Sequence, residues 1–266
     1  MKTLGIDIGT TTIGAVVLET EKRMLLESKT IPNKSFLRTK REWERIQDTA
    51  LLIKKAKALL DALLEQYPDI EAIGLTGQMH GILYTNGEGQ AVSPLYTWQD
   101  GSGDQVEFDG ESVAAWITRN YAIPAATGYG LVTHLYHVKK GQVPKGSIAL
   151  CTIADYLGMC LTERKSPLIH AGNGASLGFY DTKNWRFQAE ILEDAGIKLS
   201  MLPEVTTEVE ELGFYQGKPV FVSLGDNQAS FLSAVGMQKQ VWQVNVGTGG
   251  QLSVLSEEHF EAPGIE

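Results

Sequence analysis

The chain has 266 residues, of which 43% are hydrophobic and 21% charged, a composition that supports a substantial buried core in one large domain or two modest ones. Its formal net charge of −9 excludes a diffuse positive field that would collect nucleic acid or coat an anionic membrane. Because the two cysteines suit neither a disulfide framework nor a zinc site, and no signal peptide or membrane span is recognisable, we expect a cytoplasmic protein.

The N-terminal third predicts a meander of strands followed by an α/β crossover. Residues 2–8 and 12–18 are β-rich, and residues 24–31 are a third candidate strand. From residue 39 to residue 66 apolar side chains recur at helical spacing, which predicts one long amphipathic helix. The apolar run 70–75 after Pro68 then predicts the next strand.

The middle of the chain is less regular. Residues 81–130 are rich in Gly and Asp, as substrate-binding loops often are, and contain one clear helix at 111–121. Two further helices are expected at 153–161 and 187–195. No linker or low-complexity segment divides the chain, so a single domain is the simpler interpretation.

The C-terminal part repeats the order of strand, turn and helix, with a strand at 219–224, a turn at Gly225-Asp226 and a helix at 228–235. A closing hairpin is expected from strands at 240–246 and 251–255. Its turn resembles the turn between the first two strands, since both are rich in Gly and Thr between apolar strands.

The two glycine-threonine turns are candidate phosphate sites. Glycine lets the backbone turn tightly, so that main-chain N–H groups and threonine hydroxyls converge on a phosphate oxygen, whereas the alternative is an ordinary hairpin turn. Asp7, at the end of the first strand, is a candidate to hold Mg²⁺ through water. The candidate nucleotide-binding residues are Gly9, Thr10, Thr11, Gly247, Thr248 and Gly249.

Asp226 lies between a buried-type strand and a helix, the place where α/β proteins present carboxylates to a ligand crevice. There it is a candidate general base that accepts the proton of an attacking hydroxyl during phosphoryl transfer. The alternative is a helix N-cap, for which Asp is among the best residues.

Two polar segments suit a polyol. Gln78, Met79 and His80 follow a predicted strand and offer amide, thioether and imidazole groups to hydroxyls and C–H faces, although a lone histidine is usually a core residue. Trp98 and Asp100 pair an aromatic plane with a carboxylate, and the alternative there is an Asp-Gly turn beside a packed tryptophan.

Taken in order, five segments resemble the FGGY carbohydrate kinases: GIDIGTT at 5–11, GLTGQMHG at 74–81, TWQDG at 97–101, SLGDNQAS at 223–230 and NVGTGG at 245–250. TWQDG, with ATGYG at 126–130 and NGASLGFYDT at 173–182, is most similar to the sedoheptulokinase branch, and the xylulokinase branch is next. Asp100-Gly101-Ser102 lacks the arginine that xylulokinase-like members place there, and residues 169–173 also depart from them, which argues against D-xylulose.

The resemblance implies an α/β, actin-like or ribonuclease-H-like domain: a mixed five-stranded sheet with helices on both faces and a sugar-binding insertion. It also implies that residues 1–266 form the N-terminal, sugar-binding domain, and that the C-terminal ATP-binding domain is absent from this chain. Residue roles follow by motif: Asp226 matches the base; Gln78, Met79, His80, Asp100 and Asn227 match sugar contacts; and Asp7, Thr10, Thr11, Gly247 and Thr248 match the phosphate and Mg²⁺ region.

The leading hypothesis is therefore ATP-dependent phosphorylation of a ketose at a primary hydroxyl, with ATP and Mg²⁺ as cofactors. Because phosphoryl transfer needs both substrates in line and water excluded, we expect the isolated chain to be a poor kinase. The alternatives are a non-catalytic sugar-binding or assembly domain and an actin-like ATPase, the last of which would not need GQMHG or WQDG. The expected partners are a sugar and MgATP, without nucleic acid or membrane, and a homodimer is compatible with the sequence.

Overall fold

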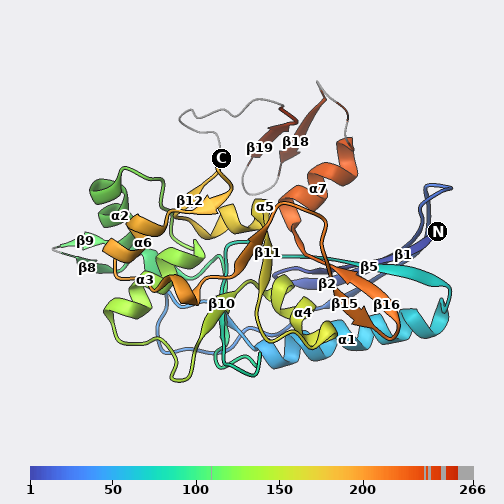
Figure 1. Ribbon diagram of the computed structural model, residues 1–266, viewed down its shortest axis with the longest axis horizontal. Helices are drawn as coiled ribbons and strands as arrows, with labels where there is room; N and C mark the ends of the chain where they lie inside the picture. The colour runs from blue at the N-terminus through green and yellow to red at the C-terminus, as the bar shows by residue number, and fades with distance from the viewer. Residues whose placement is uncertain (109, 237, 239–240, 247–249, 257–266) are drawn as a thin grey trace.

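The computed structural model describes residues 1–266 except 109, 237, 239–240, 247–249 and 257–266 (Figure 1). Among the described residues, seven strands form one mixed sheet in the order β15-β16-β5-β1-β2-β3, with β17 also paired to β5. β5 runs parallel to β1, β16 and β17, and the other pairs are antiparallel. The strands are β1 (Lys2–Ile8), β2 (Thr12–Glu19), β3 (Met24–Pro32), β5 (Ile70–Gly77), β15 (Glu211–Tyr215), β16 (Lys218–Phe221) and β17 (Leu224–Gly225).

The mixed α/β architecture confirms the expected class, but the sheet is larger than five strands. The strand predicted at 219–224 is interrupted at Val222–Ser223 and divides into β16 and β17, both of which pair with β5. β15 is a further strand that was not predicted. It forms a short antiparallel hairpin with β16 and lies at the edge of the sheet.

The first long helix, α1 (Thr49–Gln66), begins ten residues later than predicted. Asp48 caps it by accepting a hydrogen bond from the N–H of Leu51 at 2.9 Å. Residues 39–48 do not extend the helix, because β4 (Ile46–Gln47) pairs with β7 (Leu95–Tyr96). Trp43 and Ile46 belong to the helical pattern that predicted a start at residue 39. The prediction was wrong there, because strand pairing with β7 outweighs the local periodicity.

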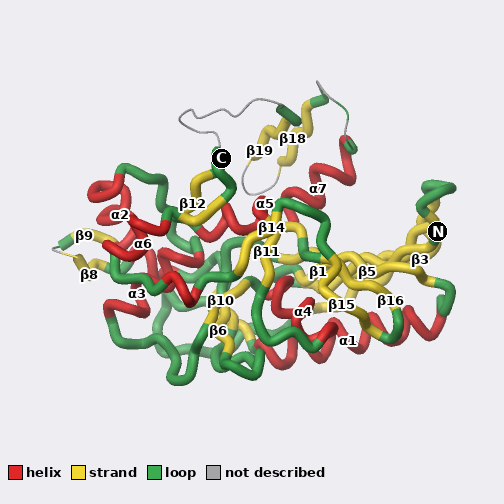
Figure 2. Tube along the Cα trace, in the orientation of Figure 1, coloured by secondary structure: helices red, strands yellow, loops and turns green. Residues whose placement is uncertain are grey.

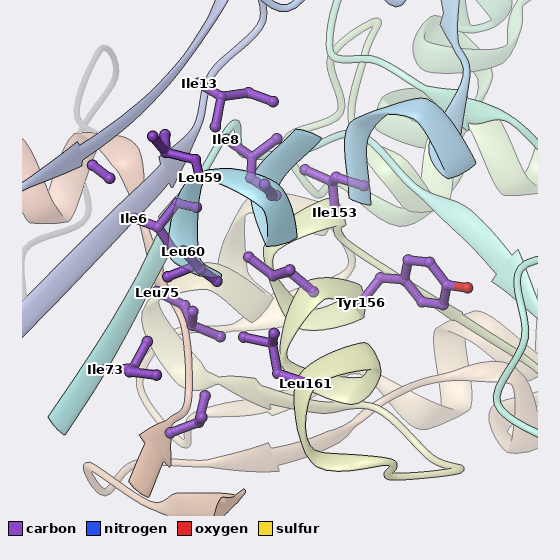
Figure 3. Packing of buried hydrophobic residues seen from close by; sticks show 14 of the residues in the cluster. Ile6, Ile8, Ile13, Leu59, Leu60, Ile73, Leu75, Ile153, Tyr156 and Leu161 are labelled. Carbon is purple, nitrogen blue, oxygen red and sulfur yellow. The ribbon is translucent and has the colours of Figure 1, made fainter. Parts of the chain in front are cut away.

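The main core lies between the sheet and two helices on one of its faces. Alternate residues of β1 point to this face, and Leu4, Ile6 and Ile8 are each at most 1% exposed. Figure 3 shows Ile6 and Ile8 in one apolar cluster with Leu60 of α1 and Leu161 of α4 (Ile153–Thr162). In Figure 1, α7 (Asp226–Val235) lies on the opposite side of the sheet from α1 and α4, so helices occupy both faces as expected.

Most of the chain between β5 and β15 forms an insertion with a second apolar core, on the left of Figures 1 and 2. Predicted helices 111–121 and 153–161 are confirmed with small shifts, whereas 187–195 begins with a strand and turns helical at Ala189. The remaining elements here are β6 (Leu83–Thr85), η1 (Gly101–Asp104), β8 (Val106–Phe108), β9 (Glu111–Ser112), α2 (Val113–Tyr121), α3 (Gly130–Lys139), β10 (Ala149–Cys151), β11 (Leu168–His170), α5 (Ala171–Gly174), η2 (Ala175–Leu177), β12 (Tyr180–Asp181), β13 (Arg186–Phe187), α6 (Ala189–Asp194), η3 (Leu199–Met201) and β14 (Glu204–Thr206).

The chain then leaves the sheet through α7, which begins two residues earlier than predicted, and continues into an antiparallel hairpin of β18 (Trp242–Val246) and β19 (Gly250–Val254). The two strands expected at 240–246 and 251–255 are thus confirmed to within two residues. In the part of the chain that the structure describes, no helix is both long and apolar enough to span a membrane.

A buried polar cluster stands inside the insertion. The Tyr84 hydroxyl lies 2.8 Å from Nδ1 of His134 and 2.9 Å from Nδ1 of His137, and the three side chains are at most 3% exposed. A hydroxyl donates one hydrogen bond and accepts another, so it satisfies both Nδ1 atoms when one of them carries a proton. Nε2 of His134 has no hydrogen-bond partner among the described residues. Burial lowers the pKa of His134 to about 4, and burial together with His134 lowers that of His137 to about 3.

We expect Tyr84→Phe to lower the free energy of unfolding by about 2 kcal/mol or more, because it leaves two buried imidazole nitrogens unpaired. Tyr180→Phe is the matched control, since the buried Tyr180 hydroxyl has no partner among the described residues and its removal should not destabilise. Urea denaturation at pH 7 measures both. Equal stability of the two variants would contradict the assigned role of the cluster.

The same cluster should make the free energy of unfolding depend on pH, which urea denaturation of the wild type at several pH values measures. The folded-state pKa values of His134 and His137 lie below the ordinary value of 6.5, so both rings stay neutral in the fold while the unfolded chain takes up protons. The stability that they contribute is complete above pH 6.5 and is lost as the pH falls towards 4 and then 3.

Candidate functional site

The carboxyl ends of three parallel strands meet at one edge of the sheet. In the parallel register Gly77 at the end of β5 pairs with Ile8 of β1 on one side and with Gly225 of β17 on the other. The segments that follow these strands therefore start side by side, which is where open α/β sheets bind ligands.

The carboxylates of Asp7 and Asp226 interact at this edge. The pKa of Asp7 is raised to about 6, first by burial and then by the negative charge of Asp226. Oδ1 of Asp7 is buried and has no hydrogen-bond partner among the described residues. Two partly desolvated carboxylates destabilise each other's charged form. A cation or a hydrogen-bond donor bound beside them would therefore be stabilised.

Asp226 is the first residue of α7, while Gly225 occupies the N-cap position without a side-chain cap. Its carboxylate accepts a hydrogen bond from the N–H of Asn227 at 2.8 Å, and burial raises its pKa, opposed by that bond and by His80. Asp226 is therefore not the N-cap residue itself, but its carboxylate satisfies one free N–H group in the first turn of the helix. A Cβ at Gly225 would clash with Oε1 of Gln228 and lie 2.5 Å from the Met79 sulfur, so a side chain at this position would force those two residues to move.

His80 is held in one orientation beside Asp226. Its backbone is left-handed, with φ of 67°, a conformation that non-glycine residues adopt rarely and that often marks functional sites. Nδ1 lies 2.7 Å from the carbonyl oxygen of Ser176, and the ring stacks on Tyr129 with centroids 5.0 Å apart. Because a carbonyl only accepts, Nδ1 carries a proton, and Nε2 is the ring nitrogen that this bond leaves unused.

The turn between β1 and β2, at residues 9–11, is held from behind by two buried amides. Nδ2 of Asn33 donates to the carbonyl oxygen of Gly9 at 2.8 Å, and Nε2 of Gln47 donates to that of Thr10 at 2.8 Å. Both amide side chains are fully buried. Because these two carbonyl groups are hydrogen-bonded within the protein, the conformation of the turn does not depend on a bound ligand.

Gln78 belongs to the same network. Its side chain is 2% exposed, and its Nε2 donates to Oε1 of Gln47 at 2.9 Å. The hydroxyl of Thr10 lies 3.4 Å from Oε1 of Gln78 and accepts a hydrogen bond at 2.9 Å from Nε1 of Trp98, which is 45% exposed. Gln78 thus connects internal groups, and Trp98 presents the accessible aromatic surface.

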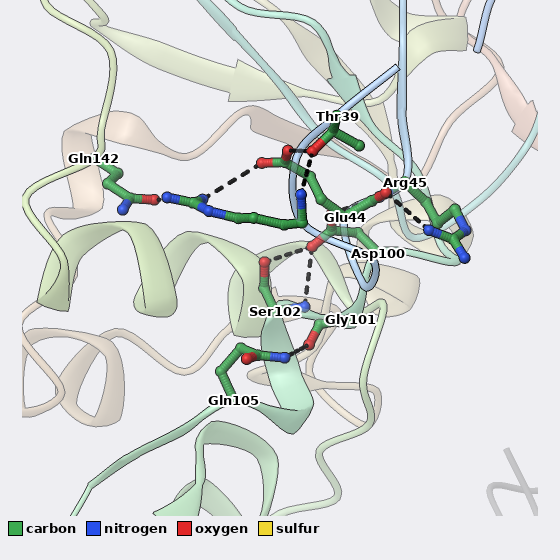
Figure 4. Close-up of polar contacts among 9 residues, drawn as sticks. Thr39, Glu44, Arg45, Asp100, Gly101, Ser102, Gln105 and Gln142 are labelled. Carbon is green, nitrogen blue, oxygen red and sulfur yellow. Dashed lines mark hydrogen bonds and ion pairs between the residues drawn. The ribbon is translucent and has the colours of Figure 1, made fainter. Parts of the chain in front are cut away.

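Asp100, expected to contact sugar, is fully buried in the structure. It accepts hydrogen bonds from the N–H of Arg45 at 3.1 Å and from the N–H of Ser102 at 3.0 Å, as well as from the Ser102 hydroxyl. Figure 4 shows these contacts joining the segment that contains Arg45 to η1. The geometry therefore favours the Asp-Gly turn for Asp100.

The remaining predicted residues divide into two groups. Asn227 follows Asp226 and is exposed, so its amide is open to a ligand. Gly247, Thr248 and Gly249 lie outside the described residues, and their assignment to phosphate stays a prediction.

No cluster of three or more metal-ligating side chains occurs in the described part of the chain. Mg²⁺ usually keeps several waters and uses only one or two carboxylates together with substrate phosphates. The unpaired oxygen of Asp7 fits that requirement, so Asp7 is a suitable residue to hold Mg²⁺ through water.

Sequence reasoning missed several residues of the site. Asn33 and Gln47 gave no usable signal, since single amides in a segment predicted as strand end and helix carry no pattern. Tyr129 and Ser176 lie inside the motifs ATGYG and NGASLGFYDT, so the family resemblance pointed to their segments without giving a role.

Comparison with known proteins adds to this geometry. A family model described as the FGGY family of carbohydrate kinases, N-terminal domain, matches residues 2–233. Sedoheptulokinase from Mus musculus is 31% identical over 293 residues, which cover 97% of this chain and 60% of that protein. The chain thus spans about 60% of the length of the sedoheptulokinases that it matches.

Solved structures share the fold. Xylulose kinase from Rhodospirillum rubrum superposes with a TM-score of 0.83 at 20% identity, covering 99% of this chain and 57% of that one. Glycerol kinase from Plasmodium falciparum, solved with ADP, has a TM-score of 0.79 at 17% identity, covering 94% and 53%. At such identities the likeness concerns the fold alone.

We expect Asp226→Asn to lower the pKa of Asp7 from about 6 towards, but not down to, its ordinary value of 3.8, because the charge of Asp226 is removed while burial remains. Carbon-detected NMR titration of the Asp7 carboxyl measures the change. Asp69→Asn, which removes an exposed carboxylate at the opposite end of β5, is the control and should leave the titration unaltered. An unchanged Asp7 pKa in Asp226→Asn would show that the two carboxylates are not coupled.

Proposed function

This chain belongs to the FGGY family of carbohydrate kinases, and we propose that it is the sugar-binding, base-bearing part of an enzyme that phosphorylates a ketose at a primary hydroxyl with ATP. The observation that carries the proposal is Asp226, a partly buried carboxylate of raised pKa at the converging strand ends, beside Asp7 and His80. A base at this position needs to be desolvated enough to accept a proton and exposed enough to reach a substrate.

In the proposed reaction, Asp226 accepts the proton of the primary hydroxyl as the sugar oxygen bonds to the γ-phosphorus of ATP. The bond from that phosphorus to the β,γ-bridging oxygen breaks, and ADP leaves with the electron pair. Asp7 would hold Mg²⁺ through water, which neutralises charge on the phosphates. The amide-braced turn at residues 9–11 supplies backbone N–H groups and the Thr11 hydroxyl to the same phosphates.

The sugar would lie between His80, Trp98 and Asn227. Nε2 of His80 would form a hydrogen bond with a sugar hydroxyl, because Nδ1 already donates to Ser176. Trp98 offers a half-exposed ring, fixed through its Nε1 to Thr10, against which the C–H face of a sugar can pack. The exposed Asn227 amide both donates and accepts, as a polyol requires.

A ketose is favoured over other acceptors by the sequence similarity to sedoheptulokinase over 97% of the chain. We assign the adenosine pocket to the part of such relatives that this chain does not cover, because the chain spans about 60% of their length. Phosphoryl transfer needs both substrates held in line, so residues 1–266 tested by themselves should bind sugar and turn over slowly. The homodimer and the cytoplasmic location stay predictions.

Asp226→Asn should reduce kcat of the complete gene product by about 10²- to 10⁴-fold, because the amide cannot accept the hydroxyl proton. The ketose dissociation constant, measured by calorimetry, should change little, since the amide still hydrogen-bonds. Asp69→Asn serves again as the control and should retain wild-type turnover. If Asp226→Asn turned over as fast as the wild type, the assigned base would be wrong.

In a coupled assay for ADP release, the complete gene product should respond to ketoses such as sedoheptulose more strongly than to glycerol. A response to aldoses or nucleosides alone would exclude the ketose assignment. Sugar binding by calorimetry without ATP-dependent turnover in the same protein would favour the non-catalytic sugar-binding domain instead.

A further inference from the structure

One carboxylate of the fold lies beneath the site and is not used by the proposed reaction. Asp155, near the start of α4, is 2% exposed, and its pKa is raised to about 6 by burial despite three hydrogen bonds that favour its charged form. Its Oδ2 accepts from the Thr152 hydroxyl at 2.7 Å and from the Thr152 N–H at 3.3 Å, which completes a capping box for α4. Helix capping therefore accounts for one of its two oxygens.

The other oxygen of Asp155 connects α4 to the strand that carries the base. Oδ1 accepts a hydrogen bond from the hydroxyl of Ser223 at 2.6 Å, and Ser223 is 1% exposed. Ser223 lies at the interruption between β16 and β17, three residues before Asp226. A short, buried hydrogen bond to a carboxylate is among the stronger neutral-to-charged contacts in proteins.

The interruption at Ser223 is a register shift next to the site. Val220 of β16 pairs with Ile73, whereas Leu224 of β17 pairs with Thr76, so four steps along one strand face three steps along the other. One extra residue in a strand bends it and redirects the side chains beyond, and such bulges are frequent beside active sites. The direction in which Asp226 leaves the sheet thus depends on how this bulge is held.

From Thr152 the hydrogen bonds continue to the other side of the site. The Thr152 hydroxyl lies 3.4 Å from Nδ2 of Asn173, and the Asn173 carbonyl accepts from the Ser176 hydroxyl at 2.7 Å. The Ser176 hydroxyl in turn accepts from the N–H of His80 at 3.2 Å. One buried chain of polar groups therefore joins the bulge before Asp226 to the residue that faces it.

We propose that Asp155 and Ser223 are positioning residues, which hold the β16–β17 bulge so that Asp226 meets the acceptor hydroxyl, and that the buried chain sets the spacing between Asp226 and His80. The inference rests on the proposed function, because it gives Asp226 the role of base. Burying a carboxylate is unfavourable unless its oxygens are bonded, and a requirement for one fixed geometry explains why this carboxylate bridges two elements. Neither residue touches substrate.

The test is Ser223→Ala in the complete gene product, with steady-state kinetics and calorimetry. The variant keeps the capping box of α4 and the contacts of His80, and it removes only the bond to Oδ1. A base displaced by a fraction of an ångström should lower kcat by about 10- to 100-fold. The ketose KM and dissociation constant should stay within about twofold of wild type, because His80, Trp98 and Asn227 are untouched.

Two further variants separate positioning from lost stability. Asp48→Ala removes the N-cap of α1, so it should lower the melting temperature without changing kcat. Ser223→Cys keeps nearly the volume of the side chain but donates weakly, so its kcat should fall between those of Ser223→Ala and the wild type. A loss of kcat in Asp48→Ala matching that in Ser223→Ala would assign the effect to stability and overturn the proposal.

The remaining outcomes are distinguishable. If Asp226→Asn abolishes turnover while Ser223→Ala and Ser223→Cys match the wild type, the positioning role is wrong and the base stands. If Asp226→Asn itself turns over normally, the proposed function fails first. If Ser223→Ala raises KM as much as it lowers kcat, the bond shapes the sugar site as a whole, which also contradicts a specific role in placing the base.

Discussion

The parallel register of β1, β5 and β17 is the constraint on which the site depends. Because Gly77 is level with both Ile8 and Gly225, the chain must leave three adjacent strands at one edge, and the residues that follow are brought together whatever their distance in sequence. Asp7 and Asp226 are 219 positions apart, yet their charges interact strongly enough to raise the pKa of Asp7. The apolar core that α1 and α4 form against one face of the sheet stabilises that register.

Around this edge, polar side chains mostly bind other parts of the protein. Gln47, Gln78 and Asn33 brace the turn at residues 9–11, and Asp100 joins a loop to η1. Such buried amides and carboxylates are retained only when their hydrogen bonds are satisfied, and in return they hold a turn without help from a ligand. The side chains left open to a ligand include Asp226, Asn227 and Trp98, which are partly or largely exposed.

The insertion has its own apolar core but is not independent of the phosphate turn. Trp98, from the insertion, donates to the Thr10 hydroxyl, and Ser176 fixes His80 at the end of β5. The contacts expected for sugar and those expected for phosphate are therefore joined by direct hydrogen bonds. A ligand that moved Trp98 would also move its hydrogen-bond partner Thr10, so the proposed sugar and phosphate sites would influence one another.

The sequence by itself determined the α/β class, the strands at 2–8 and 12–18, the later helices and the segments that meet at the site, because periodicity and short motifs are local properties. It did not determine where α1 begins, since β4 pairs with β7 far along the chain and Asp48 caps the helix. Nor did it show that Gln78 and Asp100 turn inward, or that Asp155 reaches Ser223. Those outcomes depend on which buried polar group finds a partner across 31, 55 or 68 positions of sequence, and only the packed tertiary structure brings such partners within hydrogen-bonding distance.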